Sequence, residues 1–128
     1  MEFNTAFQFV PIDKRRTVSK PRKSGITMVS DSQLGLASLS DLIEVAGHYI
    51  DLFKIATGTS RLFGKTHLQA KIEMLRACDL RPFLGGQFQE YVIHTMGIDA
   101  MPRHLSEAQA LGFDIIEISD NMIQLGQV

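Results

Sequence analysis

Four short apolar runs, separated by stretches of helical periodicity, constrain the fold of this chain more than any other feature. The runs have the length and the branched apolar residues of buried strands. Between them apolar residues recur every three or four positions, as at Leu68, Ile72 and Leu75. A helix between consecutive strands makes those strands parallel. The sequence therefore predicts an α/β fold of the order βαβαβαβ. The predicted strands lie at 26–29, 49–54, 79–84 and 113–118.

Local signals predict where the helices begin. Ser38 with Asp41 and Thr66 with Gln69 have the spacing of a capping box, which favours helix starts at Ser38 and Thr66. Pro102 suits the first turn of the last helix, where a missing N–H costs nothing. These signals support helices between the four predicted strands.

The pattern alone is compatible with a doubly wound sheet and with a parallel β/α (TIM-type) barrel. A complete barrel needs about 250 residues, and its strand ends recur about every 30 residues, as they do here. The chain has 128 residues. We therefore expect about the first four βα units, a half-barrel. Such a chain is either a fragment or a protein that covers its open sheet edges by self-association.

Two regions are expected. Residues 1–24 form an irregular N-terminal arm with a local basic cluster, and residues 25–128 form the partial β/α barrel domain. A solvated lead-in is the favoured interpretation of the cluster, and a contact with phosphate or a partner is the alternative. The cluster consists of Lys14, Arg15, Arg16, Lys20, Arg22 and Lys23.

Composition narrows the class of protein. The net charge of -1 provides no general attraction to nucleic acid or to an acidic membrane. No apolar run reaches the 18 residues of a membrane span, and the first residues lack the pattern of a signal peptide. The single cysteine, Cys78, favours a reducing cytoplasm and is expected to be a buried structural thiol. The methionines are expected in the core.

Charged residues stand at the predicted strand ends, where parallel β/α folds place their active sites. Asp31 ends the first strand, Lys54 the second and Glu117 the fourth, and Glu90 lies one turn into the helix after the third. A bare charge at the end of an apolar run is costly unless it is paired or binds a ligand. One hypothesis is a magnesium site, since Mg²⁺ prefers oxygen ligands. The other is a plain Lys54–Glu117 salt bridge.

Two glycine-containing segments are weaker signals for an anion site. Backbone amides and hydroxyls of Gly58, Thr59 and Ser60 are suited to hold a phosphate or carboxylate, although the segment is not a P-loop. Gly85 and Gly86 precede a helix and either present amides to an anion or form a tight turn. The histidines show no metal-ligand spacing and are interpreted as surface or packing residues. They are His48, His67, His94 and His104.

These residues, in this order, resemble the phosphosulfolactate synthase family. The resemblance runs from about Lys20 to Asp120 and depends on an ordered set of segments. That family implies a β/α barrel enzyme that adds sulfite to phosphoenolpyruvate with Mg²⁺, giving (2R)-phospho-3-sulfolactate, an early step towards coenzyme M. The segments are Lys20-Pro21-Arg22, 25–31, 42–54, 58–60, Gly85-Gly86 with Glu90, Leu111-Gly112-Phe113 and 116–120.

The resemblance also implies roles for the strand-end residues. Lys54, Glu90 and Glu117 would be the catalytic residues, with Lys54 as the acid or as the cation that stabilises an enediolate. Asp31 and Glu117 would hold the metal. The implied partner is a small anionic substrate, without nucleic acid or membrane, in a cytoplasmic homo-oligomer. The groups that would bind substrate are Gly58, Thr59, Ser60, Gly85 and Gly86.

Departures from the family pattern leave an alternative. Ser32 stands where the family commonly has a lysine, Leu84 and Gln87 flank the glycine pair where it has proline and threonine, and Asn121 replaces a glycine. Plant relatives linked to heat tolerance resemble the family too. The alternative function is a non-catalytic or truncated relative that acts as an interaction or stress-associated protein.

Overall fold

The computed structural model describes residues 5–17 and 19–127, and within them four parallel strands form one sheet. The strand order follows the chain, β1-β2-β3-β4, and each strand overlaps a predicted run. This confirms the α/β class and the parallel pairing. The strands are β1 (Met28–Asp31), β2 (Leu52–Ile55), β3 (Arg81–Leu84) and β4 (Ile115–Ile116).

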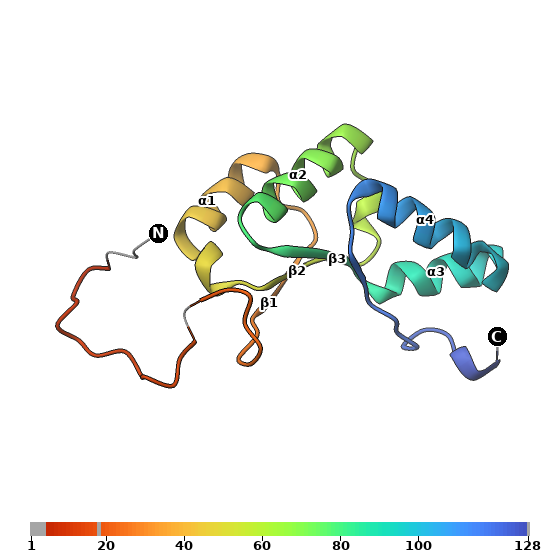
Figure 1. The fold of residues 1–128 in the computed structure, drawn as a ribbon. Helices are drawn as coiled ribbons and strands as arrows, with labels where there is room; N and C mark the ends of the chain where they lie inside the picture. Colours follow the sequence, from red (N-terminus) through yellow and green to blue (C-terminus); the bar gives the residue numbers. More distant parts are fainter. Residues whose placement is uncertain (1–4, 18, 128) are drawn as a thin grey trace.

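Helices connect every pair of consecutive strands, as predicted (Figure 1). The connection between β3 and β4 contains two α-helices. The first two helices begin earlier than the predicted capping boxes, because the carbonyls of Gly35 and Gly64 accept the N–H groups of Leu39 and Leu68 at 2.9 Å each. The helices are α1 (Leu36–Ala46), α2 (Lys65–Ala77), α3 (Gly86–Met96) and α4 (Met101–Leu111), with 3₁₀ turns η1 (Gly47–Tyr49), η2 (Thr59–Arg61), η3 (Ile98–Ala100) and η4 (Leu125–Gln127).

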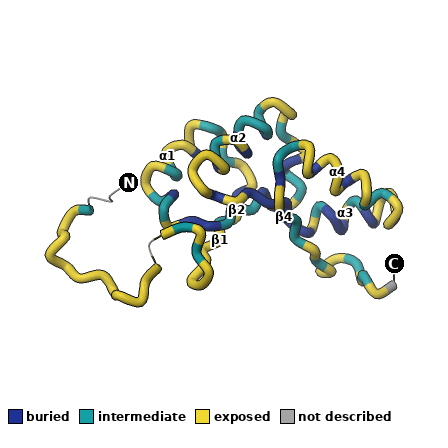
Figure 2. The backbone as a smooth tube through the Cα atoms, viewed as in Figure 1, coloured by how far each residue is buried: buried dark blue, intermediate teal, exposed yellow. Residues whose placement is uncertain are grey.

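The core lies between the sheet and the helices α1, α2 and α4 on one of its faces (Figures 1 and 2). Phe53 and Ile55 of β2 point to this face and are 0% and 1% exposed. They pack with Leu39 of α1, Ile72 of α2 and side chains of α4 in one continuous cluster. Apolar burial of this kind supplies most of the driving force that holds helices on a sheet. This side is called the helix face below.

The opposite side of the sheet carries Met28, Ser30 and Lys54 and is called the open face. Side chains alternate between the two sides of a strand, and the pairing register aligns Ser30 with Lys54 and Lys54 with Phe83. Met28 is 53% exposed and Ser30 is also exposed. A sheet that keeps helices on one face and runs in chain order lacks the reversal of strand order that defines a doubly wound sheet.

The N-terminal arm is fastened at the amino ends of β1 and β2. The Arg22 Nη1 and Asp51 Oδ1 atoms lie 2.7 Å apart, and the two side chains are only 7% and 10% exposed. Asp51 Oδ2 also accepts the Thr27 N–H at 2.8 Å, and Lys20 Nζ donates to the Gly47 carbonyl at 2.8 Å. The expected solvated lead-in is therefore wrong for Lys20 and Arg22, since buried acceptors attract their donors.

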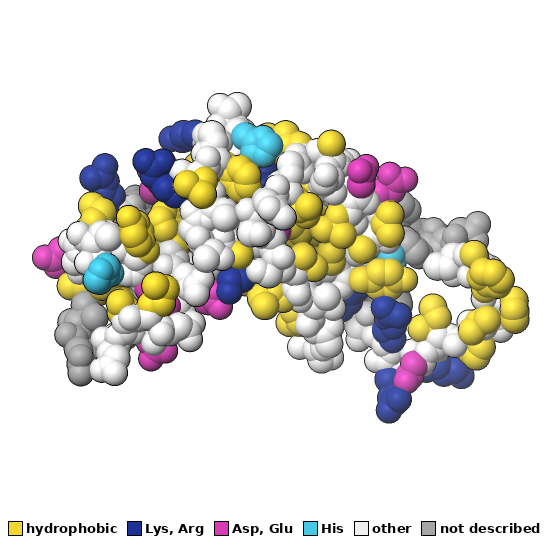
Figure 3. All heavy atoms as spheres, turned by 180° about the vertical axis from the view of Figure 1, so that it is seen from behind, with side chains coloured by type: hydrophobic (Ala, Val, Ile, Leu, Met, Phe, Trp, Pro, Cys, Tyr) yellow, Lys and Arg dark blue, Asp and Glu magenta, His cyan; other side chains and the backbone are white. Residues whose placement is uncertain are grey.

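Other parts of the arm and several predicted core residues are exposed. Hydrophobic side chains gather on the outer turn of the arm (Figure 3), where Phe7 and Phe9 are 75% and 84% exposed. Cys78, expected to be buried, is exposed because it lies beyond the last turn of α2. Met96 and Met122 are exposed as well, against expectation.

Among the described residues, no helix combines the length and apolar character needed to cross a bilayer.

Candidate functional site

The centre of the candidate site is an ion pair between Lys54 and Glu117 at the carboxyl ends of β2 and β4. Lys54 Nζ and Glu117 Oε2 lie 2.6 Å apart, and the side chains are 22% and 35% exposed. Glu117 follows Ile116, so side-chain alternation places it on the same open face as Lys54. The Gly86 N–H donates to Glu117 Oε2 at 2.8 Å. The predicted salt bridge is confirmed, and Lys54 and the Gly86 amide both hold the pKa of Glu117 below its usual value.

The glycine pair between β3 and α3 permits this close packing. A methyl group on Gly85 would lie 3.0 Å from Lys54 Cε and 3.3 Å from the Ile55 carbonyl oxygen. On Gly86 it would lie 2.5 Å from Ser119 Oγ and 2.8 Å from its Cβ. All four distances are shorter than ordinary contacts of a Cβ atom, so Lys54, Ser119 and the turn approach one another only because these two residues lack side chains.

Glu90 lies next to this turn, but its carboxylate is occupied by the chain after β4. The residue is 1% exposed. Its Oε1 accepts the Ser119 hydroxyl and, at 3.2 Å, the Asn121 N–H, and its Oε2 accepts the N–H groups of Met122 and Ile123, the latter at 3.0 Å. The Ser119 hydrogen bond and these amides lower the pKa of Glu90. Glu90 therefore organises the loop 119–123.

Asp31 points to the helix face and not toward Lys54. The pairing register aligns Asp31 with Ile55, Leu84 and Ile116. Each of these residues is one position away from a residue of the open face, so their side chains point to the helix face. Its Oδ2 accepts a hydrogen bond from Lys71 Nζ, and its Oδ1 accepts the Gln33 and Leu34 N–H groups at 2.9 and 2.8 Å. The structure thus separates Asp31 from Glu117 by the thickness of the sheet.

Lys71 is the residue of this network that sequence analysis missed. It is completely buried in α2, and its ammonium also donates to the Leu34 carbonyl at 2.7 Å and lies 4.8 Å from the centre of the Phe63 ring. A signal was present in the sequence. Lys71 lies three residues after Leu68 and four before Leu75, inside the apolar stripe of the helix.

The predicted anion segment after β2 is held by its own hydrogen bonds and packing. Gly58 has a positive φ of 72°, which favours glycine, and a Cβ there would touch the Phe88 ring at 3.4 Å. The Thr59 hydroxyl donates to the Ala56 carbonyl at 2.7 Å. Ser60 is buried and lines a cavity beside α2, α3 and α4. Its side chain therefore lies apart from the Lys54–Glu117 pair.

The described residues do not fit a metal centre by themselves. No group of three or more His, Cys, Asp or Glu side chains within 5–17 and 19–127 is arranged to hold an ion. The physical reason is that each predicted ligand has other partners: Asp31 binds Lys71, Glu90 binds the loop 119–123 and Glu117 binds Lys54. At the carboxyl ends of the strands, the open face thus offers Lys54, Glu117 and the Gly86 turn.

Comparison with known proteins gives a family match over most of the chain. The model of "(2R)-phospho-3-sulfolactate synthase (ComA)" matches residues 15–128. A phosphosulfolactate synthase of Methanothermobacter thermautotrophicus is 38% identical over 106 residues, covering 83% of this chain and 40% of the relative. That of Methanocaldococcus jannaschii is 31% identical over 115 residues, covering 90% and 41%. Protein HEAT-STRESS-ASSOCIATED 32 of Arabidopsis thaliana is 27% identical over 109 residues, covering 83% and 37%. The chain therefore spans about two fifths of the length of these relatives.

Proposed function

Because the chain belongs to the (2R)-phospho-3-sulfolactate synthase (ComA) family, we propose that it forms the Lys54 side of a site that adds sulfite to phosphoenolpyruvate. The observation that supports the proposal is the Lys54–Glu117 pair on the open face, 2.6 Å from nitrogen to oxygen. Both side chains are partly exposed, at 22% and 35%, and are reachable by an anion at the sheet edge. A buried structural pair would be closed to any ligand.

The reaction explains why a cation belongs at this position. The sulfur lone pair of sulfite forms a bond to the methylene carbon of phosphoenolpyruvate, and the electrons of the double bond move toward the adjacent carbon and its carboxylate. An ammonium group stabilises the enediolate charge that develops there. A proton must then reach the adjacent carbon, and the Lys54 ammonium is the proposed donor. The product is (2R)-phospho-3-sulfolactate.

The other predicted residues have narrower proposed roles. Glu117 orients the Lys54 ammonium and takes part through that contact. Glu90 holds the loop 119–123 beside the site. Gly85 and Gly86 allow the close approach of backbone to Lys54 and present the Gly86 amide. Gly58, Thr59 and Ser60 stay a prediction as substrate-binding groups, Ser60 only through its backbone, since its side chain borders the cavity beside α2, α3 and α4.

Magnesium belongs to the proposal only through the family. Glu117 is the one predicted ligand that faces the open face, and a hard cation there needs several more oxygen ligands than the described residues place beside it. Asp31 stays a prediction as a metal ligand, although its buried pair with Lys71 argues for a structural role. No step of the proposed reaction is assigned to the metal.

We also propose that the chain forms part of a β/α barrel and associates with itself. The chain-ordered parallel sheet with helices on one face has the arrangement of a β/α barrel wall. Its open face exposes the apolar side chain of Met28, which is 53% exposed. A second copy that adds four more strands would cover this face, so we propose a homo-oligomer. We propose a cytoplasmic location because a single cysteine favours a reducing compartment. Sedimentation at several protein concentrations measures this directly, and a monomer at high concentration would contradict it.

The non-catalytic alternative has one observation in its favour. Two of the four charged residues predicted at the site, Asp31 and Glu90, make hydrogen bonds that hold the fold together. A relative that has lost activity would keep them for that reason. Lys54 separates the two functions, because its partly exposed pair stabilises the fold only weakly.

The test is the consumption of phosphoenolpyruvate with sulfite and Mg²⁺ by the purified chain, followed by ³¹P NMR so that product and phosphate release are distinguished. We expect turnover by the unmodified chain and its loss in Lys54→Met. The control is Lys23→Met, which removes an exposed lysine from the arm. No turnover from a folded chain, or equal turnover in Lys54→Met, would contradict the proposal and favour the non-catalytic alternative.

A further inference from the structure

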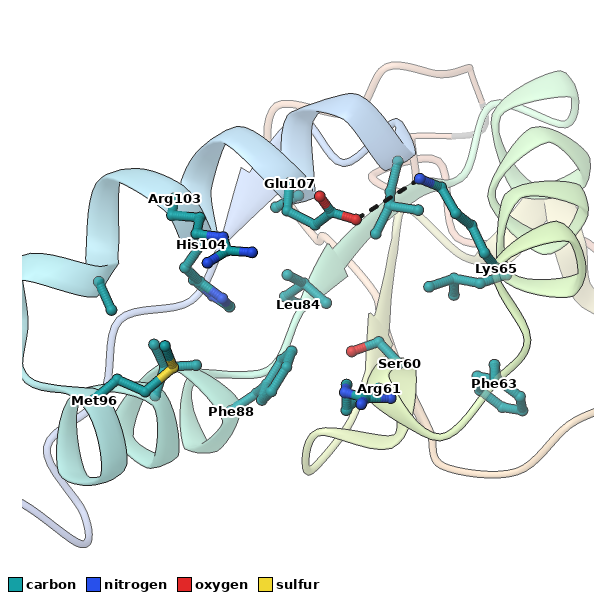
Figure 4. A pocket seen from close by; sticks show the side chains of 15 residues that line it. Ser60, Arg61, Phe63, Lys65, Leu84, Phe88, Met96, Arg103, His104 and Glu107 are labelled. Carbon is teal, nitrogen blue, oxygen red and sulfur yellow. Dashed lines mark ion pairs between the residues drawn. The ribbon is translucent and has the colours of Figure 1, made fainter.

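A groove on the helix face lies away from the Lys54–Glu117 pair. It is a cavity of about 580 Å³ between α2, α3, α4 and the η2 turn (Figure 4). Leu84 of β3, which points to the helix face, forms part of its wall together with Leu68, Phe88, Val92 and Leu111. A volume of this size and an apolar lining are typical of sites for small molecules.

Two polar atoms in the wall of this groove are buried without a hydrogen-bond partner. They are Ser60 Oγ and His104 Nε2. The two residues are 7% and 9% exposed. Buried polar atoms nearly always have partners, since an unpartnered one costs free energy. Figure 4 shows Ser60, Phe88 and His104 bordering the same space. A bound molecule with a polar end would supply the missing partner to both atoms.

The imidazole of His104 is held in place and is suited to donate. Its ring stands edge-on to Phe88, with the centroids 5.2 Å apart and the planes at 83°. Burial lowers the pKa of His104, which favours the neutral ring. A neutral imidazole protonated at Nε2 donates one hydrogen bond into the groove, and the Ser60 hydroxyl donates a second.

The charged groups at the groove are mostly cationic. Arg61, Lys65 and Arg103 line it, and among the described residues Glu107 is the one acidic residue in its wall. Lys65 Nζ and Glu107 Oε1 are 3.9 Å apart, and both side chains are more than 60% exposed, so this pair is loose. With two donors inside and an excess of cations at the rim, the groove is complementary to an anion and not to a cation.

We propose that this groove binds a small organic carboxylate with an apolar body, such as a medium-chain alkanoate. The apolar part lies against Leu84, Phe88 and Val92, and the carboxylate accepts hydrogen bonds from Ser60 and His104 within reach of Arg103. The site is separate from the proposed sulfite-adding site, because Lys54 and Leu84 point to opposite sides of the sheet. Failure of one proposal therefore leaves the other standing.

The probe is octanoate, titrated into the full chain. Binding is followed by NMR, through the backbone ¹H–¹⁵N signals and the ring signals of His104. We expect saturable binding with shifts confined to residues of the groove, and weaker binding of octylamine, which has the same chain and the opposite charge. Arg103→Gln should weaken octanoate binding about three- to fivefold, as expected for an exposed charge. Gln109→Glu is the matched control, because it makes the same change in net charge on the same helix outside the groove lining.

Ser60→Ala tests the interior donor and should weaken octanoate binding while leaving the weak binding of octylamine unchanged. Equal affinity for octanoate and octylamine would overturn the proposal, as would equal losses in Arg103→Gln and Gln109→Glu. Binding that does not saturate and shifts signals across the whole chain would show detergent-like association only, which also overturns it. Arg103 is exposed, so its variant keeps the test decisive if Ser60→Ala fails to fold.

Discussion

Lys71 and Asp31 form an ion pair inside the core, with 0% and 2% of their side chains exposed. The pair connects α2 to the carboxyl end of β1, and the Leu34 carbonyl and two backbone amides satisfy its remaining groups. Asp31, which was predicted to bind a metal ion, therefore connects a strand to a helix. Buried pairs of this kind destabilise strongly when one partner is removed.

We therefore expect Lys71→Met to lower the free energy of unfolding by about 3–5 kcal/mol, because it leaves the Asp31 carboxylate buried without its cation. Urea unfolding measures this. The double variant with Asp31→Asn should recover part of the loss, since it removes the uncompensated charge. A loss below about 1 kcal/mol in Lys71→Met, the range of surface pairs, would contradict the structural role.

The Lys54–Glu117 pair should behave differently, because both side chains are partly exposed. We expect Lys54→Met to change the free energy of unfolding by less than about 1 kcal/mol. The same urea titration gives this number, with Lys23→Met as the control at an exposed arm position. A loss of several kcal/mol would mean that the pair holds the sheet together, and would weaken the case that Lys54 is kept for a ligand.

Gly86→Ala tests the packing of the turn against Ser119. An added methyl group would meet Ser119 Oγ at 2.5 Å and its backbone N at 3.0 Å, so the loop 119–123 must move. We expect a loss of about 1–3 kcal/mol, the usual cost of overpacking, although alanine favours helices over glycine. Gly35→Ala is the control, because nothing lies within 4 Å of a Cβ there. Equal stability of the two variants would contradict the packing described.

We expect the free energy of unfolding to fall in two separate pH ranges as the solution is acidified. Burial lowers the pKa of His104 from its ordinary 6.5, so above that value both folded and unfolded chains carry neutral His104. As pH falls below 6.5 the unfolded chain binds the proton first, and stability is lost. His48 shifts in the same direction, through burial and then the nearby Arg22. Glu90 and Glu117, whose pKa values are lowered from 4.5, lose their contributions only below that value.

Urea midpoints measured from pH 8 to pH 3 separate these two ranges. His104→Phe should reduce the loss between pH 6.5 and pH 5 and leave the loss below pH 4.5 in place. His94→Phe is the matched control, because His94 is exposed on α3. An unchanged slope between pH 6.5 and pH 5 in His104→Phe would show that His104 is not the group that titrates there.

The sequence by itself determined the βα alternation and the parallel pairing, and it offered the Lys54–Glu117 pair as one of two hypotheses. These depend on local information: the period of the apolar residues, and the cost of an isolated charge at the end of an apolar run. The family follows from the same residues, because their order along the chain is specific. The prediction of strand positions within a few residues was sufficient for all of this.

Only the tertiary structure decided which side of the sheet each strand-end charge faces. A shift of one residue along a strand moves a side chain to the other face, and strands of four residues do not fix that register from sequence. Asp31 thus joins Lys71 in the core, while Lys54 stays on the open face. Glu90 is occupied by the loop 119–123, a contact about 30 residues distant in sequence. Burial is a property of the packed elements together, and for this reason the exposure of Cys78 did not follow from its local sequence. The position of Lys71 in the apolar stripe of α2 indicated burial, but only the tertiary structure showed Asp31 as its partner.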